Sequence, residues 1–271
     1  MAPKIATFFL RFLLLCSAGV WAQAYDPSKQ LSVGIILFPG FQPLDVIGPL
    51  DIIMMLSASH NISLAMIGKE EGIVPGPSPP RRNEPPTAYP VRGPSIVATH
   101  SFVDAPKLDI LLAPGGMGLR VLDENKDTWI QDFIASRYDE LQYLVSVCTG
   151  AASLAQSGVL KGRRATTNKA SWAWATQFGE GVNWVPTARW TEDGKVWTSS
   201  GVSAGIDMTY ALFKRLMGAE AANRIMNAIE YTPHLNEHWD PFSLVHKVPG
   251  ADASQQLGEC VGPAGFEFKC S

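Results

Sequence analysis

The sequence predicts one α/β domain in which a mainly parallel sheet is covered by helices on both faces. Segments with strand character alternate with segments of helical periodicity, as is typical of parallel strands joined by helical crossovers. The strand segments 31–38 and 108–113 are continuous apolar runs, as expected of strands buried on both faces. In the stretch 141–160, a third apolar run leads through a cysteine directly into a helix-forming segment.

The expected elements follow from periodicity and from turn residues. Strands are expected at 31–38, 62–67, 95–99, 108–113, 143–147 and 164–167. Helices are expected at 43–57, 125–139, 151–158, 169–178, 203–217 and 219–231. Pro43 suits the first turn of its helix, and Asp193-Gly194 predicts a hairpin between 188–191 and 195–198.

Three regions interrupt this alternation. Residues 1–24 combine Lys4, an apolar core and the cleavage-type sequence Ala22-Gln23-Ala24, so we interpret them as a secretory signal peptide; the alternative is an uncleaved membrane anchor. The proline-rich segment 72–94 predicts a solvated loop inserted into the domain 25–231, or alternatively a lid. Residues 232–271 are expected to form an irregular C-terminal tail.

Composition narrows the classes of partner. The chain has 22 basic and 25 acidic residues and a net charge of −3, which argues against nucleic-acid binding. We expect no membrane association after removal of the signal peptide. In a secreted chain Cys260 and Cys270 are able to pair, which leaves Cys148 as the odd thiol. Asn61 begins a glycosylation sequon whose use depends on secretion.

Cys148 is the expected nucleophile because it stands where the strand 143–147 meets the next helix. A strand that runs directly into a helix forms an elbow that lifts the joint residue out of the sheet. The helix directs unpaired N–H groups at that residue, so we expect the thiol to be biased towards the thiolate. The alternative is a buried structural thiol.

Other functional groups are expected at the carboxyl ends of the parallel strands, around one pocket. Asp45 is the candidate acid, because burial beside an incipient thiolate raises the pKa of a carboxyl group; alternatively it complements the helix dipole. The amides of Gly116 and Thr149 are a candidate anion hole, with Gly115 beside them.

Several separated motifs resemble the PfpI/ThiJ superfamily, relatives of class I glutamine amidotransferases. They are Ser146 to Ala151, Gly158 to Thr167, Gln42 to Asp45, Gly48-Pro49, Pro114 to Gly116, Gly201 to Asp207 and Glu230-Tyr231. The resemblance implies a flavodoxin-like fold, and within the superfamily it is closest to the isonitrile hydratase branch. In that branch a cysteine, an aspartate and the threonine after the cysteine are functional, and they match Cys148, Asp45 and Thr149.

The resemblance implies hydration of an organic isonitrile to an N-substituted formamide, with a small-molecule substrate, no cofactor and a homodimer. Asn168 departs from the branch, which usually carries a histidine there, and Asp51 stands where relatives often have glutamate. Relatives that are amidases or peptidases carry a histidine directly after the cysteine, whereas this chain has Thr149.

Alternative functions remain open. Gly201 to Gly205 match G-x-S-x-G, so Ser203 with Asp240 and His246 is a candidate serine-hydrolase triad, although Ser203 also suits a helix N-cap near the pocket. His234 to His238 match H-x-x-E-H without an evident third ligand, and we expect no metal. A glyoxalase-like thiol enzyme and a non-catalytic binding or redox module complete the alternatives.

Overall fold

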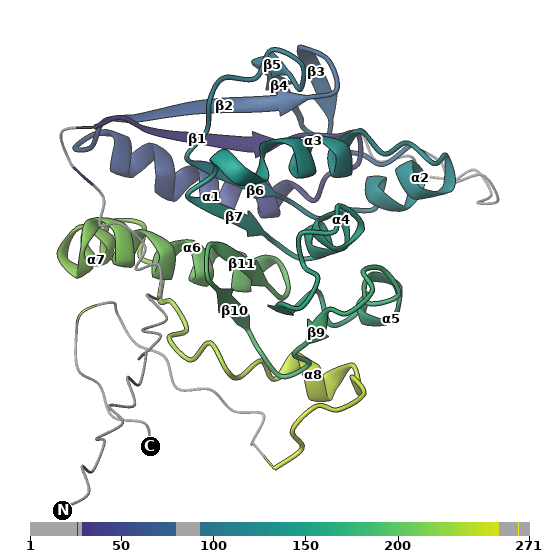
Figure 1. The fold of residues 1–271 in the computed structure, drawn as a ribbon. Coiled ribbons are helices and arrows are strands. Elements are labelled where there is room, and N and C mark those ends of the chain that lie inside the picture. The colour runs from purple at the N-terminus through teal and green to yellow at the C-terminus, as the bar shows by residue number, and fades with distance from the viewer. Residues whose placement is uncertain (1–25, 27–28, 80–92, 255–264, 266–271) are drawn as a thin grey trace, which may run out of the picture.

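A seven-stranded sheet forms the centre of the molecule (Figure 1). The computed structural model describes residues 26, 29–79, 93–254 and 265. The strands are β1 (Leu31–Ile36), β2 (Ile62–Gly68), β5 (His100–Ser101), β6 (Ile110–Ala113), β7 (Tyr143–Ser146), β10 (Trp190–Asp193) and β11 (Val196–Ser199). Their order is β10-β11-β7-β6-β1-β2-β5, and only β10 runs antiparallel to its neighbour. The mainly parallel sheet and the hairpin are therefore confirmed.

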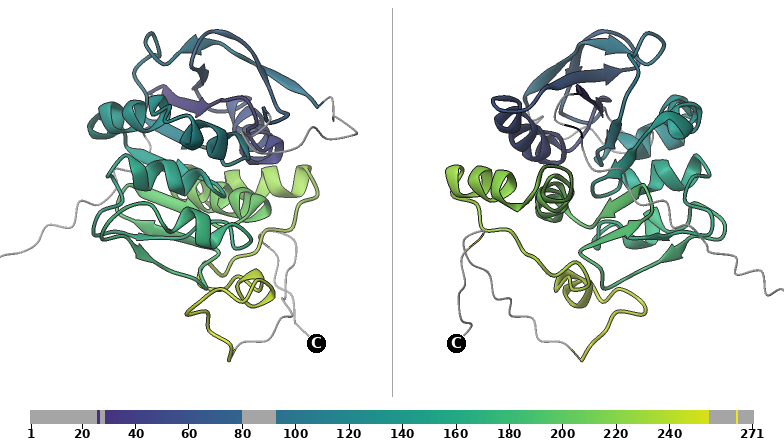
Figure 2. Two further views of the ribbon diagram at one scale, coloured as in Figure 1. Left: turned by 90° about the vertical axis from the view of Figure 1, so that its right-hand side faces the viewer. Right: turned by 60° about the vertical axis from the view of Figure 1, so that its left-hand side comes forward.

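Helices cover both faces of this sheet (Figure 2). On one face α1 (Pro43–Ser57) packs against α6 (Val202–Met217) and α7 (Ala219–Ala228). On the other face α3 (Trp129–Arg137) packs against α4 (Gly150–Gln156). Strands covered on both sides need apolar residues at successive positions, and every residue of β6 and β7 is buried.

The helix expected at 125–139 is present, but α3 begins four residues later, at Trp129, and is followed by a 3-10 turn at Tyr138–Glu140. A further helix, α2 (Gly118–Glu124), precedes it and was not expected. Lys126 lies between them with a φ of 56°, a left-handed conformation that cannot continue a helix. Trp129, Phe133 and Ile134 are buried on one face of α3, as the periodicity predicts.

The segment expected to be a loop begins with a strand. β3 (Gly72–Pro75) pairs antiparallel with β4 (Ser95–Ala98), so the chain returns as a hairpin. The segment was expected to be a loop or alternatively a lid, and its residues 80–92 lie outside the described residues. The helix expected at 169–178 shortens to the single turn α5 (Trp172–Ala175), and β8 (Arg164–Ala165) pairs with β9 (Asn183–Trp184) outside the main sheet.

The described part of the C-terminal segment, 232–254, packs on the domain without a long helix or strand. One short helix, α8 (Phe242–Val245), occurs in these residues, and Trp239, Asp240 and Val248 are buried. Among the described residues, no helix combines the length and apolar character needed to cross a membrane. The expected signal peptide and the pair Cys260–Cys270 lie outside the described residues.

Candidate active site

The elbow at Cys148 has the strained geometry that the sequence predicts. β7 ends at Ser146 and α4 begins at Gly150, so the chain turns within three residues. Cys148 has a φ of 58°, which costs an L-residue about 1–2 kcal/mol. Strain of this kind persists where the surrounding structure fixes it, commonly at functional sites. The side chain is 7% exposed.

Asp45 lies beside this thiol, in the first turn of α1. The residue is fully buried, and its Oδ2 accepts a hydrogen bond from the Gly115 amide at 2.9 Å. The carboxyl group and the Cys148 side chain are near enough to shift each other's pKa. Oδ1 has no hydrogen-bond partner among the described residues. The structure thus brings together the two residues that the sequence placed at different strand ends.

The carboxylate of Asp45 and the thiolate of Cys148 would both be negative, so each form disfavours the other. Burial raises the pKa of Asp45 to about 7, while the Gly115 amide and the Cys148 thiol lower it to a smaller extent. Burial also raises the pKa of the Cys148 thiol, and the negative charge of Asp45 raises it further. Thr149 donates through its amide and hydroxyl, which lowers the thiol pKa, but burial outweighs it. The expected bias of the thiol towards the thiolate is therefore outweighed by burial, which raises its pKa.

Thr149 and the loop 114–116 hold the pair in place. Gly116 donates its amide to Thr149 Oγ1 at 3.0 Å, and Gly115 donates to Asp45. A Cβ at Gly115 would lie 2.6 Å from the Thr149 nitrogen and 2.9 Å from Cys148 Cβ, so only glycine permits this approach. The amides expected to form an anion hole are thus engaged with the side chains that they position.

A cavity of about 300 Å³ is lined by residues next in the chain to those around the elbow. Leu44, next to Asp45, lines it, as does Asn168. The neighbouring Thr167 donates its hydroxyl to the Cys148 carbonyl at 3.0 Å, which ties this wall to the elbow. Cys148 itself is not among the residues that line this cavity.

Ser203 lies in the wall of the same cavity, at the start of α6. Gly201, not Ser203, is the N-cap residue of that helix. Asp240 and His246 also line the cavity, so the three residues of the candidate triad do come together. However, Ser203 Oγ accepts a hydrogen bond from Arg189 Nη2 at 3.4 Å, and a cation there does not remove the hydroxyl proton. Neither Ser203 nor Asp240 shares a hydrogen bond with the His246 ring among the described residues.

The histidines of the H-x-x-E-H pattern take separate partners. His234 Nδ1 lies 3.6 Å from Asp207 Oδ2, whereas His238 Nε2 lies 3.5 Å from Glu237 Oε1. Within the described ranges, no three histidine, cysteine or acidic side chains gather in a way suited to a metal ion.

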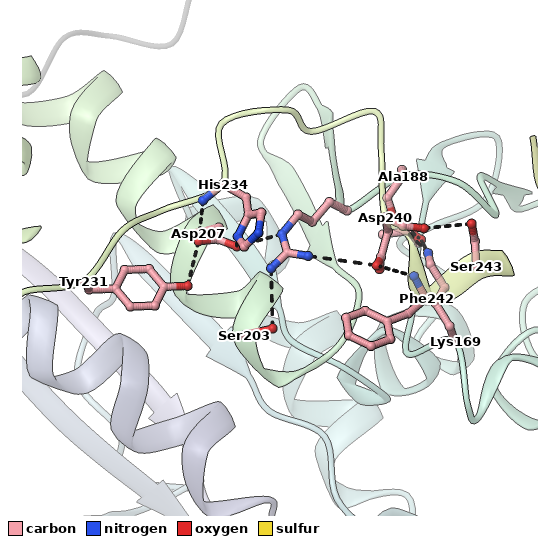
Figure 3. Close-up of polar contacts among 11 residues, drawn as sticks. Lys169, Ala188, Ser203, Asp207, Tyr231, His234, Asp240, Phe242 and Ser243 are labelled. Atoms are coloured by element: carbon pink, nitrogen blue, oxygen red, sulfur yellow. Dashed lines mark hydrogen bonds and ion pairs between the residues drawn. The ribbon is translucent and has the colours of Figure 1, made fainter. Parts of the chain in front are cut away.

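Sequence reasoning missed a buried polar network behind the cavity (Figure 3). Arg189 Nε donates to Asp207 Oδ2 at 2.7 Å, and Tyr231 Oη donates to Asp207 Oδ1 at 2.8 Å. The His234 amide donates to the same oxygen at 3.1 Å. Arg189 Nη1 lies 3.9 Å from Asp240 Oδ1. The available signal was Asp207 itself, an acid between the apolar residues Ile206 and Met208 of the helix.

The chain is similar to known proteins over most of its length. The profile of the DJ-1/PfpI family matches residues 31–215. The chain is 33% identical over 204 residues to an isonitrile hydratase from Pseudomonas putida, which covers 75% of this chain and 79% of that protein.

Solved structures give the same result for the fold. A THiJ/PfpI family protein from Pseudomonas syringae has a TM-score of 0.61 at 26% identity, and the match covers 76% of this chain and 77% of that one. Drosophila melanogaster DJ-1beta has a TM-score of 0.60 at 18% identity, with 75% and 99% covered. The second likeness concerns the fold alone.

Proposed function

The chain belongs to the DJ-1/PfpI family, and on that premise we propose that it hydrates an organic isonitrile to an N-substituted formamide. The observation that carries this proposal is the buried Asp45 carboxyl group beside Cys148, a proton donor next to a nucleophile, with Gly115 in contact with both residues. The similarity to an isonitrile hydratase supports the choice of substrate. Thr149 after the cysteine supports it as well, because a Cys-His hydrolase needs a base there.

The first half of the reaction joins sulfur to the isonitrile carbon. The Asp45–Cys148 pair holds one dissociable proton at neutral pH, because two adjacent buried negative charges exclude each other. The sulfur attacks the terminal carbon of R–N≡C, and that carbon takes the proton of the pair. The product is the thioimidate R–N=CH–S, and Asp45 is left as a carboxylate.

The second half consumes water. The Asp45 carboxylate accepts a proton from water as the oxygen adds to the thioimidate carbon. The hydroxyl proton of the adduct passes to nitrogen, the C=O bond forms as the C–S bond breaks, and the sulfur leaves as a thiolate, so that R–NH–CHO is released and the Asp45–Cys148 pair again holds the proton taken from water. A carboxyl group with a pKa of about 7 both donates and accepts protons readily near neutral pH. Thr149 steadies the sulfur as it leaves, through the amide and hydroxyl that face it.

The proposal is tested with purified protein and a simple isonitrile such as cyclohexyl isonitrile. Cys148→Ala and Asp45→Asn are each expected to lower kcat/KM by at least about a hundredfold, the usual scale for loss of an acid or nucleophile. Asp132→Asn, an exposed acid on α3, is the matched control and retains full activity. Unchanged turnover in both site variants would contradict the proposal.

The same panel separates the alternatives. Turnover of methylglyoxal but not of isonitrile would support the glyoxalase-like enzyme. Labelling of Ser203 by a fluorophosphonate probe would support the serine hydrolase. A thiol that reacts with the ordinary pH dependence of cysteine, without any turnover, would support a binding or redox module.

We also propose that the protein is a homodimer and that it is secreted. DJ-1/PfpI proteins commonly act on small molecules and are often dimeric. Here α1 exposes Leu44, Ile47 and Met54 along its length, and such a face suits a second copy of the chain. Light scattering checks the mass, and N-terminal sequencing of exported protein checks cleavage before Tyr25.

A further inference from the structure

The cavity beside the elbow has a polar end that the proposed reaction does not use. Leu44 and Asn168, the chain neighbours of Asp45 and Thr167, line this cavity together with Lys169, Arg189 and Ser203. An isonitrile needs neither a cation nor a hydrogen-bond donor on its substituent. This polar wall therefore implies that the substituent itself carries a group that such donors recognise.

Lys169 is the unusual member of this wall. Its residue is 3% exposed, and Nζ donates to two neutral oxygens, Thr166 Oγ1 at 2.7 Å and the Ala188 carbonyl at 2.8 Å. Among the described residues, no carboxylate lies within 4.0 Å of this nitrogen. A buried charge without a counter-ion is costly, so the pKa of Lys169 falls to about 7, mainly through burial.

The other charges around the cavity are already matched. Arg189 is paired with Asp207, and Asp240 accepts the Phe242 amide at 3.1 Å while facing Arg189. Asp240 raises the pKa of Lys169 and Arg189 lowers it, each by less than burial does. His246 is the remaining titratable group of the wall. Asp207 and Asp240 thus equal Arg189 and Lys169 in number, but both carboxylates lie against Arg189 and neither forms an ion pair with Lys169.

The N-terminus of α6 adds to this positive character. Val202 and Ser203 are the first residues of this 16-residue helix, and both line the cavity. No side chain caps the helix, so its first amides are available to an acceptor. An anion at this point would face both the helix end and the Lys169 ammonium group.

We propose that this cavity binds a carboxylate on the substituent of the substrate, and that Lys169 supplies the counter-charge. The inference rests on the proposed function, since it names the substrate class as carboxylate-bearing isonitriles. The isonitrile group lies towards Leu44 and the elbow, and the carboxylate lies at the Lys169 end. Lys169 is a binding residue here and takes no part in the bond changes.

The test compares a charged substrate with its neutral counterpart, 3-isocyanopropanoate and its methyl ester. The wild-type protein is expected to prefer the acid by at least about tenfold in kcat/KM, which corresponds to about 1.4 kcal/mol. Lys169→Met is expected to reduce this preference to about one, whereas Lys169→Arg keeps part of it. Lys161→Met, an exposed lysine, is the control and keeps the wild-type preference.

Binding is measured separately from turnover, with the product 3-formamidopropanoate and Cys148→Ala protein. Calorimetry in buffers of different ionisation enthalpy is expected to show proton uptake at about pH 8, because the bound anion restores the charge of Lys169. The formamide methyl ester is expected to bind at least about tenfold more weakly and without proton uptake.

The outcomes distinguish the two proposals. Equal kcat/KM for acid and ester overturns the carboxylate site while the hydratase stands. Absence of turnover together with Lys169-dependent binding of 3-formamidopropanoate overturns the hydratase and supports the anion site. Absence of both overturns the carboxylate site. If Lys169→Met does not fold, as thermal unfolding would show, the acid–ester comparison on the wild type still decides.

Discussion

The carboxyl group of Asp45 in α1 and the thiol of Cys148 at the elbow before α4 are both buried, and each shifts the pKa of the other. The amide of Gly115, just after β6, donates a hydrogen bond to Asp45 Oδ2 at 2.9 Å. Each negative charge of the pair disfavours the other, so the two groups titrate as a unit. The predictions below address this unit and its surroundings.

Asp45→Asn is expected to flatten the pH dependence of folding stability. The carboxyl pKa is 3.8 in the unfolded reference and about 7 in the folded chain, so the folded state binds more protons between these values. Stability contributed by the protonated group is therefore lost as pH rises from about 4 to about 7 and is constant above that. Urea unfolding at several pH values measures the slope, and an unchanged slope in the variant contradicts the assignment.

Thr149→Val is expected to slow alkylation of Cys148 at neutral pH. The hydroxyl of Thr149 lowers the thiol pKa, and valine removes it while keeping the shape of the side chain. Thr149→Ser retains the hydroxyl and serves as the control. The rate of reaction with iodoacetamide against pH reports the thiol pKa. Superimposable profiles for valine and serine would show that the hydroxyl does not act on the sulfur.

Cys148→Gly is expected to be more stable than Cys148→Ala by about 1 kcal/mol, because glycine tolerates the left-handed φ of 58°. Both variants are expected to be inactive. Ala151→Gly, in the neighbouring helix α4, is the control of opposite sign and destabilises by about 1 kcal/mol. Urea midpoints compare the three. A less stable glycine variant at position 148 would mean that the elbow is not strained.

Arg189→Met is expected to lower the free energy of unfolding by about 3 kcal/mol, since it leaves the buried Asp207 charge without its ion pair. Lys69→Met breaks an equally short pair with Asp127, but that lysine is exposed, so the loss stays below about 1 kcal/mol. Chemical unfolding of both variants makes the comparison. Equal losses in the free energy of unfolding would show that burial does not determine how much the Arg189–Asp207 pair contributes to stability.

The sequence identified those elements whose local signals agree with their tertiary surroundings. The first helix begins and ends where periodicity and Pro43 place it. The elbow was predictable because an apolar, β-branched segment, now β7, is followed directly by a helix-forming segment, now α4. Asp45, Cys148 and Thr149 come together because parallel strands end at the same edge of a sheet.

Other features depend on long-range contacts that no local pattern reveals. The break between α2 and α3 rests on the left-handed conformation of Lys126, which is not a residue typical of such a position. β3 forms in a proline-rich stretch because β4 pairs with it. The protonation of Cys148 was wrongly predicted because burial, which overrides the helix end, is a property of the folded environment.

The cavity wall includes Asp240, Phe242 and His246, which follow the family match that ends at residue 215. These residues share the wall with Lys169 and Arg189, which lie inside the match. Exchange of residues 232–254 between relatives is therefore expected to reshape part of this wall and to leave Asp45, Cys148 and Lys169 in place.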